Sequence, residues 1–301
     1  MRPSPWYAFL MLLAGSSFGI VSPIMKMSYA HGFGAADVTN AQYLFAAITL
    51  WPLALIWPKG KRVSGKQWGI LMVLGLAGAG TSYTYYLSLT KLPASLGIVL
   101  LFQFAWIVLL MDSLVTRRVP AIEKLLGIVM IILGTILAVG IMGSKLPPVP
   151  LWAVLLGLLS AFFYSLTLYL SAYVDPDTSP ALRSAITVTI SGISILPFFP
   201  PAHLYLVTLW QGIWGWGLLV ALFSQTLPLI LIYLAIPRIG GRMAGVLGAI
   251  ELPVAVLAAH IVLGEPVAPV RWFGVLLILA GILVSEWTLF RRPRRLSPAH
   301  R

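Results

Sequence analysis

A single acidic side chain, Glu251, lies in the middle of the apolar stretch GVLGAIELPVAVLAAHIVLGEP, which covers residues 245–266. An ionised carboxylate at the centre of a bilayer costs roughly 2.5–3.5 kcal/mol on insertion scales. A carboxyl at that depth therefore needs a partner inside the protein. Two roles fit it equally: it holds a cationic group of a ligand or takes up a proton, or it is a protonated structural acid that hydrogen-bonds neighbouring helices.

The helical face around Glu251 is made of small residues. They are Ala244, Gly248, Ala255 and Ala258. Small residues let a neighbouring helix approach closely or leave a cavity open beside the carboxyl. The second acid of this stretch, Glu265, stands in a Gly-Glu-Pro turn, where we expect it to cap or brace the end of a helix.

Aromatic and amide side chains inside other apolar stretches are further candidates for ligand contact, because a site for a large apolar solute needs adaptable apolar walls and a few polar groups. The candidates are Tyr83, Tyr86, Gln103, Trp106, Tyr164 and Gln225. A buried amide must find a partner, so each glutamine either bonds a polar group of the ligand or ties helices together. The two tyrosines near residue 85 also fit an interfacial aromatic belt.

The composition places all these residues in a membrane protein. Hydrophobic residues make up 59% of the 301 residues and charged residues 9%, with a mean hydropathy of +0.96. A water-soluble fold of this length cannot bury so much apolar surface. The chain has no cysteine, which excludes disulfides, thiolate-held clusters and thiol catalysis.

Charged, Pro-rich and Gly-rich clusters divide the chain into ten predicted membrane-spanning helices. Their ranges are 5–29, 38–57, 67–89, 94–115, 121–142, 150–173, 181–199, 209–234, 239–262 and 270–290. With both termini in the cytoplasm, sixteen of the twenty Lys and Arg residues lie on the cytoplasmic side. The net charge of +12 therefore needs no nucleic-acid partner. The basic tail is expected to be solvated or to contact anionic lipid.

The two halves of the chain resemble each other. A shift of 147 residues lays Gly127 on Gly274 and Gly134 on Gly281, and Tyr164 takes the repeat position of Phe18 at a shift of 146. Because five spans is an odd number, the second half enters the membrane inverted. We expect repeats at 1–145 and 146–290 and a cytoplasmic tail at 291–301. Inverted repeats are typical of alternating-access transporters, with the binding site near the midplane.

Several classes of function lack their motifs in this sequence. There is no Walker A motif and no HExxH motif, and the four histidines have no metal-site spacing. We therefore expect no cofactor, no metal and no enzymatic activity, and energy from a substrate gradient or a coupled ion. A passive channel stays open as an alternative. An intramembrane enzyme based on Glu251 would lack a second catalytic group at the same depth.

Two stretches resemble the drug/metabolite transporter superfamily, specifically its ten-helix EamA-type members. They are LLAGSSFGIVSPIMK in the first span and GAIELPVAVLAAHIVLGEPVAPVRWFGVLLILAGILV at the end of the chain. The pattern departs from the family at Pro253, one place late, and at residues 118–120, where the first half often has a Glu turn.

Within the superfamily the chain is most similar to YddG-type exporters of aromatic amino acids and methionine. This resemblance implies all-α architecture with two inverted five-helix repeats around a central cavity. It also implies export of aromatic and other large neutral amino acids across a bacterial inner membrane. Cationic drugs or another small metabolite are the alternative cargo. The oligomeric state stays open, a monomer included.

Overall fold

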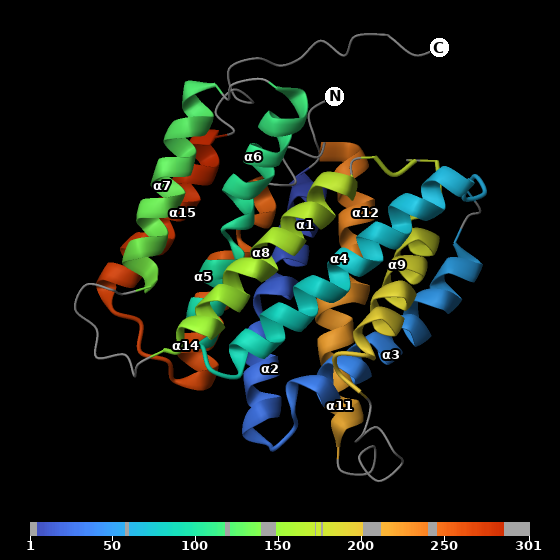
Figure 1. Ribbon diagram of the computed structural model, residues 1–301, viewed down its shortest axis with the longest axis horizontal. Helices are drawn as coiled ribbons and strands as arrows, with labels where there is room; N and C mark the ends of the chain where they lie inside the picture. The colour runs from blue at the N-terminus through green and yellow to red at the C-terminus, as the bar shows by residue number, and fades with distance from the viewer. Residues whose placement is uncertain are drawn as a thin grey trace.

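The computed structural model describes residues 5–57, 60–117, 121–139, 149–171, 173–175, 177–200, 212–239 and 246–285. The predicted basic tail lies outside these residues. All regular elements of the described part are helices, which confirms the predicted all-α class (Figure 1). In the same view α1 begins and α15 ends toward one end of the molecule, which we call the proximal end; the opposite end is the distal end.

The helices follow the apolar stretches, but several ends differ from the expected ranges: α3 begins at Ala35 rather than at 38, and α12 continues to Ile239 rather than ending at 234. Their bounds are α1 Pro5–Gly19, α2 Val21–Ala30, α3 Ala35–Ile56, α4 Gly65–Leu89, α5 Ala94–Leu101, α6 Phe104–Thr116, α7 Ile122–Val139, α8 Leu151–Ser171, α9 Pro180–Ile195, α11 Ile213–Ala221, the π-helix η1 Leu222–Thr226, α12 Leu227–Ile239, α14 Glu251–Leu263 and α15 Pro269–Ser285.

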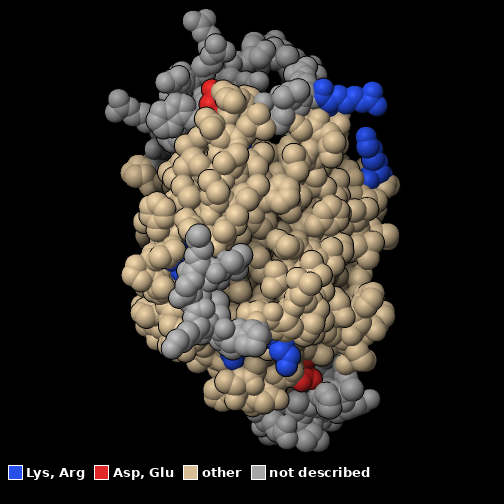
Figure 2. All heavy atoms as spheres, turned by 60° about the vertical axis from the view of Figure 1, so that its left-hand side comes forward, with Lys and Arg blue, Asp and Glu red and all other residues tan. Residues whose placement is uncertain are grey.

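Much of this helical structure is long and apolar enough to cross a membrane. Seven helical segments of the described residues meet both criteria, and α9 and α15 are shorter apolar helices. On the face shown in Figure 2, most of the visible charged side chains gather toward the two ends of the molecule, and the broad band between them is almost entirely made of other residues. The protein is therefore a multi-pass membrane protein, while the count of ten spans stays a prediction.

The helices pack as two bundles that each combine both halves of the sequence. Bundle A contains α4, α5, α6, α8 and α9, and bundle B contains α1, α2, α3, α11, η1, α12 and α14. The two bundles meet along α3 and α9, whose contact is about as extensive as those within each bundle. A shift of 147 residues along the sequence exchanges the two bundles. It carries α4 of bundle A onto the segment that forms α11, η1 and α12 of bundle B. The remaining two helices, α7 and α15, pack against each other at the side of the molecule (Figure 1).

The contact between α7 and α15 is antiparallel and runs through glycines. A Cβ atom added to Gly127 would lie 2.6 Å from the carbonyl oxygen of Gly281, and one added to Gly134 would lie 2.7 Å from that of Gly274. The repeat shift converts the first contact into the second. Such reciprocal pairing is the mark of a two-fold axis, so the two halves are related by a pseudo-two-fold that inverts one against the other.

Three of the predicted spans are interrupted one helical turn before a proline. Pro23, Pro228 and Pro253 follow the interruptions at Ile20, within η1 and at 249–250. Proline has no N–H for the carbonyl four residues earlier and its ring crowds that carbonyl. Around Ala249 the backbone bonds shorten to the 3₁₀ spacing, with Leu252 N donating to Ala249 O at 3.2 Å.

A side chain interrupts the fourth span in the absence of proline. The amide of Gln103 donates to the carbonyl of Val99 at 3.0 Å, while its own backbone N–H bonds Leu100 O at 3.1 Å. A side chain that competes for a backbone carbonyl in this way disturbs the α-helical ladder. The break between α5 and α6 corresponds through the repeat to the break before α14, so the two halves are interrupted at matching positions.

Candidate functional site

Glu251 is the first residue of α14 and lies at the break of the ninth span. Its side chain is half-buried, and no described residue hydrogen-bonds its carboxyl. The carboxyl interacts electrostatically with Tyr85 of α4 and Tyr164 of α8, which both belong to bundle A. A buried polar group without a protein partner needs water, a proton or a ligand. Glu251 therefore lies between the bundles with free capacity to bind.

Tyr85, which the sequence did not single out, is the second unsatisfied group here. It is 6% exposed and its hydroxyl makes no hydrogen bond with a described residue. That hydroxyl faces Ser22, which is 1% exposed and belongs to α2 just after the break of the first span. Tyr85, Ser22 and Glu251 thus form a small polar cluster at the meeting of both bundles.

The opposite wall of this cluster is aromatic. The ring of Tyr164 meets the ring of Phe104 edge to face, with centroids 4.9 Å apart, and Phe104 is 5.2 Å from the ring of Phe102. Phe104 is the first residue of α6, at the break of the fourth span. The predicted candidate Tyr164 therefore joins Glu251 at the centre of the molecule, with an aromatic wall beside it.

Gln103 and Trp106 bond each other. The indole N–H of Trp106 donates to the Gln103 side-chain carbonyl at 2.9 Å, and the Gln103 amide donates to Thr135 Oγ1 of α7 at 2.6 Å. Gln103 is 4% exposed and all its polar atoms are bonded. Of the two roles expected for this glutamine, the geometry fits the tie between helices, and the half-buried Trp106 is held by that glutamine through its indole N–H.

Tyr83 and Tyr86 lie on α4, on either side of Tyr85 in the sequence. Tyr83 packs on Phe199 and Phe198 after α9, with ring centroids 4.7 Å and 5.4 Å away. Tyr86 is 5% exposed and its ring lies 5.7 Å from that of Tyr85. Tyr86 therefore adjoins the central cluster, whereas Tyr83 belongs to an aromatic contact within bundle A.

Gln225 lies in the π-helix η1, half-buried and without a hydrogen bond to a described residue. Single π-helical turns are frequent at functional sites. A different amide, Gln42 of α3, reaches this turn and donates to Ser224 Oγ at 3.0 Å, and the Ser17 hydroxyl donates to the carbonyl of Phe223 at 2.8 Å. The break of the eighth span is thus held by α1 and α3.

The two segments of the fourth span differ in burial on either side of the centre. All eight residues of α5 are buried, and α5 packs against α14 of the other bundle. None of the described side chains of α6 is buried, and α6 packs on α8 and α7. On the distal side of Glu251, α5 is therefore buried between the bundles, whereas α6 on the proximal side has no fully buried side chain among its described residues.

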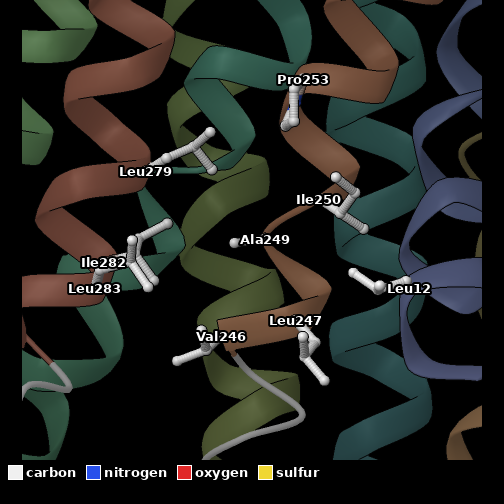
Figure 3. A pocket seen from close by; sticks show the side chains of 9 residues that line it. All are labelled: Leu12, Val246, Leu247, Ala249, Ile250, Pro253, Leu279, Ile282 and Leu283. Carbon is white, nitrogen blue, oxygen red and sulfur yellow. The ribbon is translucent and has the colours of Figure 1, made fainter. Parts of the chain in front are cut away.

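An apolar pocket of about 190 Å³ opens next to the broken start of α14. Figure 3 shows Leu279, Ile282 and Leu283 of α15 on one side of it and Leu12 of α1 on the other. Residues 246–253 supply the rest of its lining, but Glu251 is not among them. The pocket adjoins the polar cluster without containing its carboxyl.

Comparison with known proteins assigns the family. Residues 5–140 and 151–287 each match the EamA-like transporter family, so the chain belongs to that family and contains its unit twice. A solved crystal structure superposes with a TM-score of 0.64 at 12% identity and covers 96% of this chain and 98% of its own. That likeness shows the fold alone. The resemblance to EamA-type transporters is confirmed.

Among curated proteins, the threonine/homoserine exporter RhtA of Salmonella typhimurium strain LT2 is 25% identical over 294 residues, covering 96% of this chain and 94% of that protein. RhtA of Escherichia coli K12 is 26% identical over 262 residues, covering 85% and 83%. An uncharacterized transporter of Methanothermobacter thermautotrophicus is 27% identical over 190 residues, covering 60% and 53%.

Proposed function

We propose that this chain is a secondary transporter that exports amino acids by alternating access between bundles A and B. The observation that carries the proposal is the Glu251 carboxyl, which lies at the junction of broken helices and accepts no hydrogen bond from a described residue. A carboxylate in that position complements the α-ammonium group that all amino acids share. Export is supported by relatives that bear the name of threonine/homoserine exporters.

The side chain of the cargo would lie against the aromatic wall. Tyr164 of α8 interacts with Glu251, and the ring of Phe104 at the start of α6 packs edge to face on the ring of Tyr164. Aromatic surfaces accept apolar side chains of several sizes, which supports large neutral amino acids, the aromatic ones included. The relatives named for threonine and homoserine support smaller neutral ones, so the proposed cargo class is neutral amino acids.

Membrane and orientation belong to the same proposal. We place the chain in a bacterial inner membrane with the proximal end in the cytoplasm, because sixteen of the twenty Lys and Arg residues then lie inside. In this orientation the more exposed segment of the fourth span, α6, lies on the cytoplasmic side of the site, where an exporter must bind its cargo.

Counterflow into proteoliposomes tests the proposal. Purified protein is reconstituted, and uptake of labelled phenylalanine and of labelled threonine is measured with and without unlabelled amino acid inside. We expect saturable uptake that the internal amino acid accelerates, which a passive channel cannot produce. Uptake of labelled tetraphenylphosphonium with neither amino acid transported would overturn the amino-acid proposal in favour of organic cations, which the same carboxylate could attract.

A further inference from the structure

At the distal end, one carboxylate of bundle B holds the start of a helix of bundle A. Glu265 follows α14, and its two oxygens accept hydrogen bonds from the backbone N–H of Ala94 at 2.6 Å, the backbone N–H of Ser95 at 3.1 Å and the hydroxyl of Ser95 at 2.6 Å. These N–H groups are at the N-terminus of α5, where a helix has unpaired donors and favours a negative charge.

A second side chain of bundle B, Lys26 of α2, binds the turn that precedes α5. The ammonium of Lys26 donates to the carbonyl oxygens of Leu89 at 3.1 Å and Leu92 at 3.0 Å, in the turn between α4 and α5. One turn further out, the Tyr29 hydroxyl donates to the carbonyl of Tyr86 at 3.0 Å. Lys26 also interacts electrostatically with Glu265. The positive charge of Lys26 and the negative charge of Glu265, both from bundle B, therefore bind the two ends of the α4–α5 turn of bundle A.

These bonds lie where the bundles must part for the site to open distally. Ser22 and Glu251 lie deeper than Lys26, and α5 packs directly on α14. Alternating access requires the distal contact between bundles to break and re-form in each cycle. Contacts made of hydrogen bonds at a membrane surface suit this use, because water can replace each partner at a small net cost.

We propose that Glu265 and Lys26 form the distal gate of this transporter, closed in the present structure and opened when both release the α4–α5 turn. This inference rests on the alternating-access part of the proposed function but not on the identity of the cargo. The other use of such bonds would be a permanent brace, which would stay intact throughout the cycle.

Thiol labelling measures distal opening without any cargo. The chain has no native cysteine, so Ser22→Cys introduces a single thiol beneath the gate. We expect a membrane-impermeant maleimide added from the distal side to label it roughly tenfold or more faster when Glu265→Gln is present, since bonds to a charged acceptor are lost. A Lys26→Met variant should accelerate labelling in the same direction with Glu265 untouched.

Controls separate gating from reagent access and from general loosening. A cysteine at the exposed Lys91 of the distal turn should label at the same rate in all backgrounds. Glu123→Gln, at the other end of the molecule, should leave Ser22→Cys labelling unchanged. Equal rates in the Glu265→Gln, Lys26→Met and unmodified backgrounds would overturn the gate.

Cross-linking decides between a gate and a brace. A short bifunctional thiol reagent is used to link cysteines placed at Ser95 and Glu265. Cysteines at Gln67 of α4 and Asp175 between α8 and α9, whose backbone N–H donates to the Gln67 side chain at 3.0 Å, are the matched pair within bundle A at the proximal end. We expect the first link to stop counterflow and reduction to restore it, while the second link is tolerated. Unchanged counterflow with the Ser95–Glu265 link formed would show a static brace. If neither amino acid is transported even before linking, the cargo proposal fails while the labelling result still stands.

Discussion

The backbone of Glu251 lies directly against Gly19: a Cβ atom at Gly19 would lie 2.8 Å from the carbonyl oxygen of Glu251 and 2.9 Å from Cγ1 of Val254. The break of the first span therefore meets the break of the ninth. Each break is followed by a proline, Pro23 in the first span and Pro253 in the ninth. Glu251, the irregular backbone around it and the facing Gly19 pack together, and we call them the Glu251 unit.

Replacing Gly19 should disturb that unit. In Gly19→Val, the added side chain collides with backbone that cannot move freely, so we expect a loss of roughly 1–3 kcal/mol of stability, the usual cost of overpacking, together with reduced transport. Thermal unfolding in detergent and counterflow measure the two effects. Gly69→Ala is the matched control, because nothing lies within 4 Å of a Cβ at Gly69; an equal loss in that variant would contradict the argument.

Pro253→Ala should repair the ninth span. The new N–H can donate to the carbonyl of Ala249, and removing an interior proline gains up to about 3 kcal/mol of helix stability. We expect a protein that is as stable or more stable but transports more slowly, because the carboxyl of Glu251 is rotated by the regular helix. Pro52→Ala in α3, which is unbroken around its proline, should leave counterflow unchanged. Normal transport by Pro253→Ala would count against a role for the break.

Gln103 should prove structural. Gln103→Leu leaves the indole N–H of Trp106 without its acceptor, at a cost of about 1–3 kcal/mol for an unsatisfied group. It also removes one of the two hydrogen bonds of the Thr135 hydroxyl, which still donates to the carbonyl of Ile131 at 2.7 Å. The midpoint of thermal unfolding should fall, while the KM of the surviving folded protein stays near its original value. Thr135→Val should reproduce part of the loss. A raised KM with unchanged stability would instead place Gln103 among the substrate ligands.

The ion pair between Lys61 and Asp177 contributes to the stability of the fold in a way that depends on pH. The hydrogen bond to Asp177 and its negative charge raise the pKa of Lys61 above the ordinary 10.5. Because the pKa of Lys61 is higher in the folded protein than in the unfolded chain, the stability that the ion pair adds is complete below pH 10.5. It is lost as the pH rises through the pKa that Lys61 has in the folded protein. Asp177→Asn should therefore be slightly less stable than the unmodified protein at about pH 8, with the difference vanishing at strongly alkaline pH. A constant difference in unfolding midpoint across that range would contradict this assignment.

The repeat and the role of Glu265 could be predicted from the sequence because each depends on local pattern. The glycines matched at a shift of 147 residues are the ones at which α7 and α15 touch. Glu265 was expected to cap or brace a turn, and it does cap a helix, although that helix lies in the other half of the sequence.

The helix breaks and the partners of the polar groups could not be predicted in the same way. Proline alone does not determine a break, since α3 continues through Pro52. Tyr85 could not be separated from its neighbours Tyr83 and Tyr86, because only the packing of α4 against other helices decides which hydroxyl faces Glu251. The contacts of Lys26 with the α4–α5 turn join residues more than sixty positions apart in the sequence. The spacing of apolar residues carries no information about such contacts.

The central claim is that Glu251 binds the ammonium group of an amino acid. The most direct test is counterflow of labelled amino acid by Glu251→Gln beside the unmodified protein and Glu251→Asp, with unfolding midpoints measured for all three. Loss of a charge-assisted bond predicts a fall in transport of roughly tenfold to a hundredfold for the glutamine variant at unchanged stability, with partial recovery for aspartate. Unimpaired counterflow by Glu251→Gln would contradict the account.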